Sequence, residues 1–423
     1  MRQYDIIVAG GGFAGAAAAI SAARLGKNVL LFDKANALGG AACNCLVNPF
    51  MPYRTKIDGK TTRLSSGLFE EIQKRLSEVR NELSELKFAE NDSFFGEEHL
   101  KLALNRMACE AGVHLLYHAT LCGVKKNGKK LESVTVATKA GNIELCADYF
   151  IDATGDADLS VAAGVKTRLG RPQDSLCQPM TLCFRVGNVD VDGFYAEREK
   201  WQSLYAKLLA EGKLRNPREN ILVFRTIQKG VLHFNSTRIV KKNPTDPFDV
   251  TEAEIEAREQ AIELFLLLKH NIEAMKDAEL LSTAAEIGVR ESRMIDGEHI
   301  LTGKEIIDCC RFEDSIACGN YDVDIHNPEG SGTSHYYFPD GQYYQIPYRS
   351  LVPRDIDNLL VAGRCISVDH EAQASIRIMP IVCCLGEAAG VGAAVAFDGK
   401  CAAKDADIQT IRDILHKNGA VID

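Results

Sequence analysis

The sequence predicts an α/β protein in which both ends of the chain build a domain with a parallel sheet, and the middle forms an inserted α+β domain. Near the N-terminus, the apolar segment 4–9 leads straight into a cluster of glycines, as a buried parallel strand does when it ends in a tight turn. Near the C-terminus, segment 359–362 repeats the buried-strand pattern. The middle of the chain alternates more, as in a partly antiparallel sheet. We therefore expect the first domain to comprise 1–168 and 347–423, and the inserted domain 169–346.

The other elements of the first domain follow from hydrophobic periodicity. The predicted helices are 14–25, 66–86, 97–112 and 379–397, and the predicted strands are 29–32, 113–117, 131–138, 143–146 and 149–151. The middle strands are expected to form a small β-meander beside the parallel sheet, which makes this domain three-layered.

The inserted domain is expected to be more irregular. Its predicted strands are 180–186, 221–226 and 231–237, and its predicted helices are 192–212 and 251–275. Segment 312–346 is rich in Gly, Tyr, His and Asp and is expected to form loops over a sheet.

Composition and charge narrow the classes of function. The chain has 423 residues, 46% apolar and 25% charged, as in an ordinary globular enzyme with a small-molecule substrate. A net charge of −9 argues against nucleic acid or an anionic membrane surface as the main partner. The most apolar stretch, 378–397, is interrupted by several glycines and a glutamate, so we expect a buried helix rather than a membrane span. Only three residues precede the first strand, so we expect no signal peptide and a cytoplasmic location.

The 14 cysteines include no C-x-x-C motif, which disfavours zinc and iron–sulfur sites, and we expect no metal. Most of them are expected to be small buried side chains. Cys43 and Cys45 could form a redox-active pair, because they follow Gly39 and Gly40. The alternative, packed side chains, is favoured because C-x-C spacing suits an internal disulfide poorly.

A Rossmann-type dinucleotide fingerprint occupies the first strand–helix junction. Gly10, Gly12 and Gly15 fit G-x-G-x-x-G: the first permits the tight turn, the second lets the backbone approach a pyrophosphate, and the third lets the helix pack closely on the strand. The helix N-terminus offers N–H groups and the positive end of its dipole to the phosphates. Asp33 follows the second strand, where a carboxylate accepts hydrogen bonds from ribose hydroxyls and disfavours NADP. The fingerprint alone leaves FAD and NAD open.

Three further segments distinguish FAD from NAD: 32–40, 151–156 and 358–390. The first contains Gly-Gly after Phe-Asp-Lys, the second reads Ile-Asp-Ala-Thr-Gly-Asp, and the third contains Ala-Gly-Arg and Arg-Ile-Met-Pro. In these segments the chain resembles the FAD-dependent oxidoreductases of the glutathione-reductase-like flavoproteins, in the branch that includes the flavin subunit of heterodisulfide reductase. The resemblance extends into 288–293 and covers most of the chain apart from about 188–280.

The resemblance implies FAD as the cofactor and a set of residues around it. The implied cofactor-binding residues are Gly10, Gly12, Phe13, Ala14, Gly15, Asp33, Lys34, Gly39, Gly40, Ala41, Leu121, Ala153, Gly155, Gly363, Arg364, Ile378 and Met379. Leu121 would meet the adenine, Ala153 and Gly155 the adenosine half, and Gly363 and Arg364 the ribityl chain.

The helix that starts near Met379 would point its N-terminus at the pyrimidine ring of the flavin. A helix N-terminus stabilises the negative charge that a reduced flavin carries at N1 and O2, and Pro380 suits the first turn. The chain departs from the family at one position. Many relatives have an acid directly after the glycine that matches Gly363, where this chain has Arg364.

Four residues are the main candidates for catalysis. His326 and His370 are acid–base candidates, and His370 has acidic neighbours in sequence that would raise its pKa on contact. Arg290, or its neighbour Arg293, could clamp a substrate carboxylate or diphosphate, and Arg377 could neutralise the substrate or the reduced flavin. A structural ion pair or hydrogen bond is the alternative for each. Weaker candidates are His299, His335, Tyr343, Tyr344 and Tyr348.

Three functions remain open from the sequence. The first is a stand-alone flavoenzyme that oxidises or reduces a small organic substrate by hydride transfer to or from flavin N5. The second is a flavin-bearing electron-transfer subunit with iron–sulfur partners, similar to that of heterodisulfide reductase. The third is a structural flavoprotein that uses FAD only to stabilise its fold. No second G-x-G-x-x-G occurs, so electrons from NAD(P)H would require a transiently bound nicotinamide or an electron donor or acceptor protein.

Overall fold

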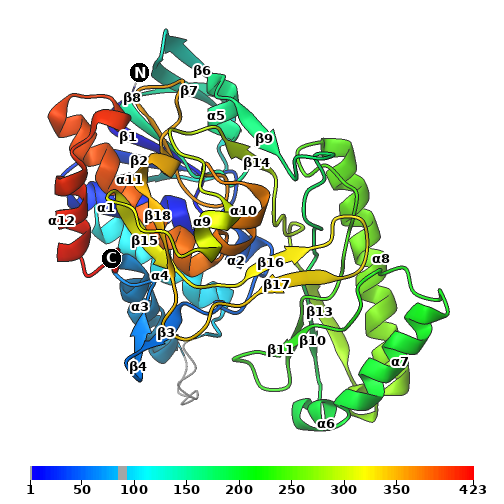
Figure 1. Ribbon diagram of the computed structural model, residues 1–423. Coiled ribbons are helices and arrows are strands. Elements are labelled where there is room, and N and C mark those ends of the chain that lie inside the picture. The colour runs from blue at the N-terminus through cyan, green and yellow to red at the C-terminus, as the bar shows by residue number, and fades with distance from the viewer. Residues whose placement is uncertain (1, 84–92) are drawn as a thin grey trace.

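The computed structural model describes residues 2–83 and 93–423, which form a seven-stranded and a four-stranded sheet in addition to four two-stranded pairs (Figure 1). The larger sheet has a parallel part in which β1 lies in the centre. The parallel strands, in spatial order, are β5 (His114–Leu116), β2 (Val29–Phe32), β1 (Arg2–Ala9), β8 (Gly141–Asp152) and β19 (Leu359–Val361). The strand from the C-terminal part therefore completes the sheet begun by the N-terminal part, and the predicted α/β fold with a parallel sheet is confirmed.

The predicted meander lies at the edge of this sheet, where β7 (Lys130–Thr138) pairs antiparallel with the first half of β8 and β6 (Thr120–Asn127) pairs antiparallel with β7. The predicted strands 143–146 and 149–151 are one strand in the structure. β8 stays paired with β1 from Leu145 to Asp152, so the strand continues past Asp148, the polar residue between the two apolar segments.

Two helices of small residues pack against each other on one face of the parallel sheet: α1 (Phe13–Arg24) and α11 (Met379–Gly399). A Cβ atom on Gly386 would lie 2.1 Å from the carbonyl oxygen of Ala14, so this close approach requires glycine. On its other side, α11 contacts β15. Among the described residues, α11 is the one helix long and apolar enough to span a membrane, and 89% of its most apolar window is buried inside the protein.

The remaining elements of this part of the molecule surround that core. The helices are α2 (Ala41–Asn44), α3 (Leu68–Leu83), α4 (Glu97–Glu110), α5 (Asp158–Ala163), α9 (Gly303–Ile307), α10 (His370–Ile376), α12 (Ile408–Lys417), η2 (Tyr348–Leu351) and η3 (Ala403–Asp405), and the strands are β3 (Arg54–Ile57), β4 (Lys60–Arg63), β15 (Ser315–Gly319) and β18 (Tyr344–Pro347). Of the predicted helix 66–86, the last three residues lie outside the described part of the chain.

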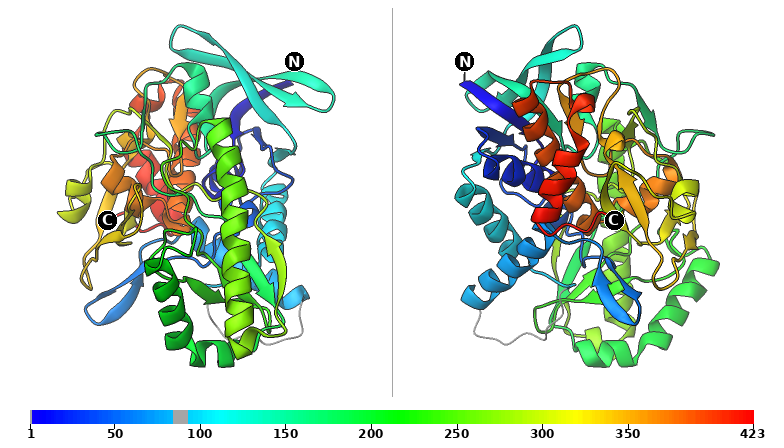
Figure 2. Two further views of the ribbon diagram at one scale, coloured as in Figure 1. Left: turned by 90° about the vertical axis from the view of Figure 1, so that its right-hand side faces the viewer. Right: turned by 60° about the vertical axis from the view of Figure 1, so that its left-hand side comes forward.

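A smaller antiparallel sheet, three α-helices and one short 3-10 helix form the cap, seen on the right of Figure 1. The strands, in spatial order, are β11 (Val223–Arg225), β12 (Leu232–Phe234), β10 (Phe184–Gly187) and β13 (Glu279–Thr283), and the helices are α6 (Val191–Ala196), α7 (Arg198–Ala210), α8 (Pro247–Asn271) and the short η1 (Glu273–Met275). The long helix α8 runs along one side of the cap (Figure 2).

The predicted single helix 192–212 is broken at Glu197 into α6 and α7. The break allows Phe194 to stack on Trp201, with ring centroids 4.9 Å apart. In a continuous helix, residues seven positions apart are separated by about 10 Å along the axis, so this stacking requires a change of direction.

Two strand pairs connect the cap with the large sheet. β9 (Thr167–Leu169) pairs with β14 (Arg293–Ile295), so the chain enters and leaves the cap side by side. The hairpin of β16 (Val323–His326) and β17 (Thr333–Tyr336) extends toward α8 (Figure 1). Segment 312–346, expected to form loops, thus contributes paired strands, because backbone pairing across a hairpin does not require the apolar alternation that was sought in the sequence.

Candidate active site

A cavity of about 470 Å³ lies between the cap and the carboxyl ends of the parallel strands, the edge at which open α/β sheets bind ligands. The residues that follow β1, β2, β8 and β19 all reach it. The lining from the large domain is Gly10, Gly12, Phe13, Ala14, Asp33, Lys34, Gly39, Gly40, Ala41, Ala42, Asn44, Cys45, Ala153, Thr154, Gly155, Asp156, Gly363, Arg364, Arg377, Met379 and Val382. The lining from the cap side is Pro244, Val250, Glu254, Glu286, Ile287 and Val289.

Every predicted cofactor residue lines this cavity except Gly15, Leu121 and Ile378. Gly15 lies beneath the loop, where it contacts the carbonyl of Gly10, and so it supports the loop from below. Leu121 is half-buried on β6. Ile378 is the N-cap residue of α11 and is buried.

In the glycine loop, Gly15 is packed tightly against Gly10, whereas Gly12 has free space beside it. A Cβ on Gly15 would lie 1.8 Å from the Gly10 oxygen, so the helix can approach the loop only with glycine at this position. A Cβ on Gly12 would meet no heavy atom closer than the Cα of Gly40 at 4.0 Å. The space beside Gly12 is therefore open to the cavity, as close approach of a pyrophosphate requires.

Asp33 is held in place by two backbone groups. Its Oδ2 accepts a hydrogen bond from the Gly11 N–H, and its Oδ1 accepts one from the Ala35 N–H at 2.7 Å. The adjacent Lys34 pairs with Glu286 from the cap side at 3.2 Å. The carboxylate predicted to bind ribose is thus oriented by the loop itself, and an ion pair crosses the cavity beside it.

Arg364, the residue that departs from the family pattern, pairs with Asp156 at 2.6 Å. Ser292 donates a further hydrogen bond to this carboxylate, and the Arg293 Nε donates to the Asp156 backbone oxygen at 2.7 Å. Burial alone would raise the pKa of Asp156, but the charge of Arg364, together with the hydrogen bonds from Ser292 and Arg364 and the charge of Arg293, lowers that pKa. In the described chain, Nε of Arg364 is buried without a hydrogen-bond partner, which leaves a donor for a ligand in the cavity.

These features fit an elongated dinucleotide. Helix α1 begins at Phe13 and α11 at Met379, and both residues line the cavity, so both helices direct positive dipole ends and first-turn N–H groups toward it. Unpartnered, buried Nε atoms of Arg364 and Arg377 add two donors within the described residues. Such a site favours an anionic ligand with acceptor atoms along its length.

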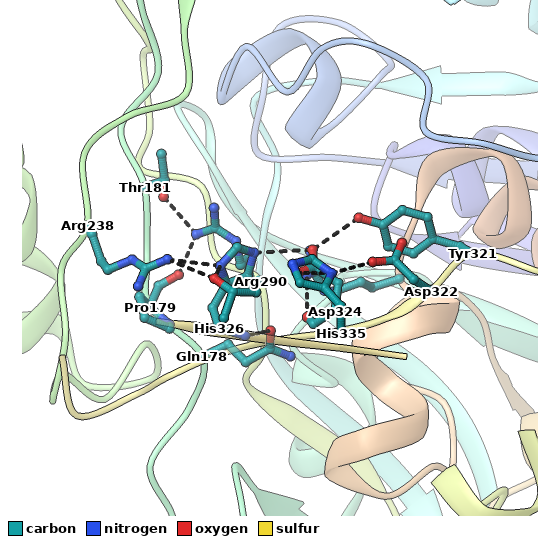
Figure 3. Close-up of polar contacts among 12 residues, drawn as sticks. Gln178, Pro179, Thr181, Arg238, Arg290, Tyr321, Asp322, Asp324, His326 and His335 are labelled. Atoms are coloured by element: carbon teal, nitrogen blue, oxygen red, sulfur yellow. Dashed lines mark hydrogen bonds and ion pairs between the residues drawn. The ribbon is translucent and has the colours of Figure 1, made fainter. Parts of the chain in front are cut away.

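Three of the four predicted catalytic residues lie near Asp324: Arg377, which lines the cavity, and His326 and Arg290, which lie behind it (the latter two are labelled in Figure 3). Arg377 lines the cavity and donates from Nη2 to the Asp324 backbone oxygen and to Oδ2, both at 3.3 Å. Asp324 also accepts from the Tyr321 hydroxyl at 3.0 Å and lies 3.2 Å from Nε2 of His326. Burial alone would raise the pKa of Asp324, but the hydrogen bond from His326 and the charge of Arg377 lower it well below its usual range.

His326 is buried, and both of its ring nitrogens have partners. Nδ1 lies 3.1 Å from Nη2 of Arg238, which can only donate, so Nδ1 accepts. Nε2 therefore carries the proton and donates to Asp324. Burial, together with the charge of Arg290, lowers the pKa of His326 to about 3, so the ring is neutral near neutral pH.

Arg290 lies beside His326 and donates from Nη1 to the Pro179 oxygen at 2.6 Å and to Thr181 Oγ1 at 2.7 Å (Figure 3). The acids near it in sequence pair with other residues: Glu286 with Lys34, Glu291 with His370, and Asp296 with Arg168.

His370, like His326 and Arg290, does not line the cavity, and it does not contact Asp324. Its Nδ1 donates to Glu291 at 2.7 Å, and both side chains are buried. Burial alone would lower the pKa of His370, but the hydrogen bond to Glu291 and the charges of Glu291 and Glu371 together raise it above its ordinary value. The other oxygen of Glu291 accepts from the Gln178 N–H, and Oε1 of Gln178 accepts from the His326 N–H at 3.3 Å. His370 thus supports the strand of His326 through two intermediates.

The weaker candidates have structural partners. His299 pairs with Glu305 and His335 with Asp322, and the hydroxyls of Tyr343, Tyr344 and Tyr348 bind Asp423, Ser375 and Ala403. Burial raises the pKa of both Cys43 and Cys45 to about 12, which favours packed thiols over a redox pair.

The sequence reasoning missed Arg218 and Arg238, which lie in the cap region that the family resemblance did not cover. Arg238 follows β12, is 1% exposed and contacts His326. Isolated arginines between apolar residues carry no local signal, because the residues that they meet are far away in the sequence.

Comparison with known proteins gives one family. The family model described as "FAD dependent oxidoreductase" matches residues 5–415. Comparison with the curated proteins finds no match. The family match leaves the predicted branch with heterodisulfide reductase open, and that finer assignment stays a prediction.

Solved structures are similar at low sequence identity. A geranylgeranyl bacteriochlorophyll reductase-like protein from Thermoplasma acidophilum is 14% identical, with a TM-score of 0.49 over 99% of this chain and 84% of that one. The p-nitrophenol 4-monooxygenase of Pseudomonas putida is 9% identical, with a TM-score of 0.49 over 100% and 88% of the two chains. A flavin-dependent brominase is 15% identical, with a TM-score of 0.48 over 97% and 83%. On the family match, the chain belongs to the FAD-dependent oxidoreductases and is a flavoenzyme with FAD as its cofactor.

Proposed function

We propose that the enzyme transfers a hydride between a small organic substrate and N5 of the flavin, with the substrate bound where the FAD cavity meets the polar groups around Asp324. The position of Arg377 carries this proposal. Its side chain lines the cavity, and its guanidinium also contacts Asp324, beside His326 and Arg290. A molecule held at Arg377 lies next to both the cofactor site and the predicted substrate-binding side chains.

The bound flavin supplies the hydride chemistry, so the residues of the chain have to bind and orient the substrate. Arg377 and Arg290 supply positive charge for an anionic or polarised group on the substrate. Asp324 holds Arg377 in place and is itself anchored by the Tyr321 hydroxyl.

His326 is a positioning residue in this proposal. Both of its ring nitrogens form hydrogen bonds, one to Asp324 and one to Arg238, and its pKa of about 3 keeps the ring neutral. His326 therefore fixes the positions of these two side chains and does not exchange protons with the substrate. His370 is a second positioning residue, because it acts on the His326 strand only through Glu291 and Gln178.

Anaerobic reduction of the FAD-loaded protein tests the proposal. Pools of small metabolites are added under anaerobic conditions, and loss of flavin absorbance identifies the pool that contains a donor. Arg377→Gln is expected to retain FAD but to be reduced much more slowly, whereas Arg225→Gln, which removes an exposed charge from β11, is expected to behave as the wild type. If no donor reduces the bound FAD while dithionite does, a structural role for FAD replaces the proposal.

The alternative of an electron-transfer subunit has no observation in its favour. Neither the family description nor the named similar structures include such a subunit.

A further inference from the structure

Beside Asp324, buried and half-buried arginines carry more positive charge than the carboxylates paired with them neutralise. The arginine cluster consists of Arg218 and Arg238, which are buried, and of Arg290 and Arg377, which are half-buried. Arg238 pairs with Glu219 at 3.2 Å, and Arg377 pairs with Asp324 at 3.3 Å. In the described part of the chain, Arg218 and Arg290 form no ion pair. An unpaired buried charge is costly, so a cluster of this composition favours an anionic ligand.

Arg218 is the clearest case. It is 5% exposed, its Nη1 is buried without a partner in the described chain, and its Nε makes one long hydrogen bond of 3.4 Å to Asn220. The segment around it is fixed, because Tyr205 donates to the Arg218 oxygen at 3.0 Å and Asn216 donates to Ser236 at 2.6 Å. The guanidinium is therefore held inside the protein by its backbone, with donors left over.

Arg290 has donors left over as well, because its hydrogen bonds to residues 2–83 and 93–423 both come from Nη1. Burial, followed by the charges of Arg377 and Arg218, lowers the pKa of Arg290 to about 9. Hydrogen bonds also bring Arg290 and the segment of Arg218 to one place: Thr181, which accepts from Arg290, donates to the Thr237 oxygen at 2.9 Å, and Asn216 donates to the oxygen of the adjacent Ser236. Arg377 contributes a third unpartnered donor, its buried Nε, as judged over the described residues.

We propose that the substrate is an organic acid whose carboxylate groups are bound by Arg218 and Arg290, next to Arg377 at the edge of the FAD cavity. This inference rests on the proposed function, since it names the substrate class for the same site. A carboxylate is favoured because its two coplanar oxygens match the guanidinium fork. A dicarboxylate is favoured over a monocarboxylate, because Arg218 and Arg290 leave two positive charges without acidic partners.

Binding to the FAD-loaded enzyme tests this inference without turnover. Succinate, propionate, inorganic phosphate and uncharged succinamide are titrated at constant ionic strength, and the heat of binding and the shift in the flavin absorption spectrum are measured. Succinate is expected to bind tightest and to shift the spectrum, propionate to bind more weakly, and succinamide not to bind. Binding of phosphate without binding of either carboxylate would overturn the assignment to organic acids, and binding of none of the four would overturn the anion site.

Variants locate the binding. Arg218→Gln and Arg290→Gln are each expected to weaken succinate binding about 10- to 100-fold, the effect of losing a charge-assisted hydrogen bond. Arg225→Gln, a matched loss of exposed charge in the cap, is expected to leave the affinity unchanged. Because loss of a buried arginine can prevent folding, Arg290→Lys is a second variant that keeps the charge and loses the fork, with an expected loss of about tenfold. Wild-type affinity in a folded Arg218 or Arg290 variant would overturn the proposal.

The same samples separate this inference from the proposed function. FAD content and reduction by dithionite are measured before each titration. A protein without FAD, or with FAD that no organic donor reduces, contradicts the proposed function. A protein that is loaded and reduced by a neutral donor, but binds no carboxylate, contradicts only the organic-acid substrate.

Discussion

Replacement of Gly12 by alanine separates binding of FAD from folding. Gly12 has φ −66° and ψ −174°, a conformation that any residue adopts, and its Cβ would have no protein atom closer than 4.0 Å. Gly12→Ala is therefore expected to fold without strain and to gain about 0.4–1 kcal/mol in the free energy of unfolding of the apoprotein, as alanine restricts the unfolded chain. The added methyl group, however, occupies the open space where the pyrophosphate approaches.

The expected loss in affinity follows from the contacts that the methyl group displaces. If the pyrophosphate moves away by the width of that group, two charge-assisted hydrogen bonds to the loop are weakened, each contributing about 1.5–3 kcal/mol. A total loss of about 3 kcal/mol corresponds to a Kd for FAD about 100-fold higher. Gly12→Val, with a larger branched side chain, is expected to retain no FAD.

Gly15→Ala is the matched control, because its effect is expected on folding. Its Cβ would lie 1.8 Å from the Gly10 oxygen, so helix α1 has to move away from the loop, and overpacking of this kind lowers the free energy of unfolding by about 1–3 kcal/mol or more. Urea unfolding of the apoproteins and quenching of flavin fluorescence measure the two quantities separately. Wild-type affinity for FAD in Gly12→Ala, or unchanged stability in Gly15→Ala, would refute the reasoning.

Three further predictions concern buried titratable groups. Burial lowers the pKa of His233 to about 3 from an ordinary 6.5, so in acid the unfolded state binds more protons than the folded state. Lowering the pH from about 6.5 to about 5 should therefore reduce the free energy of unfolding, measured with urea, by about 2 kcal/mol more in the wild type than in His233→Phe. Cys43 and Cys45, with pKa values of about 12, should not react with a disulfide-exchange reagent in the native protein near about pH 8, and labelling of either before unfolding would contradict this. Asp156→Asn should lower the free energy of unfolding by about 2 kcal/mol. This loss is smaller than for a fully buried ion pair, because the side chains of Asp156 and Arg364 are 28% and 20% exposed. An unchanged urea midpoint would show that the pair does not stabilise the fold.

The parallel sheet and its edge were predictable because their signals are local. The run 4–9, the glycines after it and Asp33 lie within one strand–helix–strand unit, so their spacing alone predicts the turn and the close approach. The return of the chain at 359–362 was predictable for the same reason, since a fully buried strand has a continuous apolar run. The domain boundaries after 168 and 346 stay predictions.

The polar groups around Asp324 were only partly predictable. His326, Arg290 and Arg377 were selected by residue type, but the arrangement of their hydrogen bonds depends on three separate segments meeting. The pairing of His370 with Glu291 shows the limit of reasoning from neighbours in sequence. The adjacent Glu371 does raise the pKa of His370, as expected, but the hydrogen bond and the larger effect come from Glu291, 79 positions away.

The sequence by itself determined that this protein binds a dinucleotide in a Rossmann-type domain, because the loop that holds a pyrophosphate is built from consecutive residues whose conformations glycine permits. The family resemblance of three further segments identified that dinucleotide as FAD. Only the tertiary structure decided which charged side chains lie next to the FAD cavity. Arg218, Arg290 and Arg377 come from different elements, and their charges become important only when packing removes water and places them together. Burial of charge is a property of the folded interior, so no pattern of neighbouring residues predicts it.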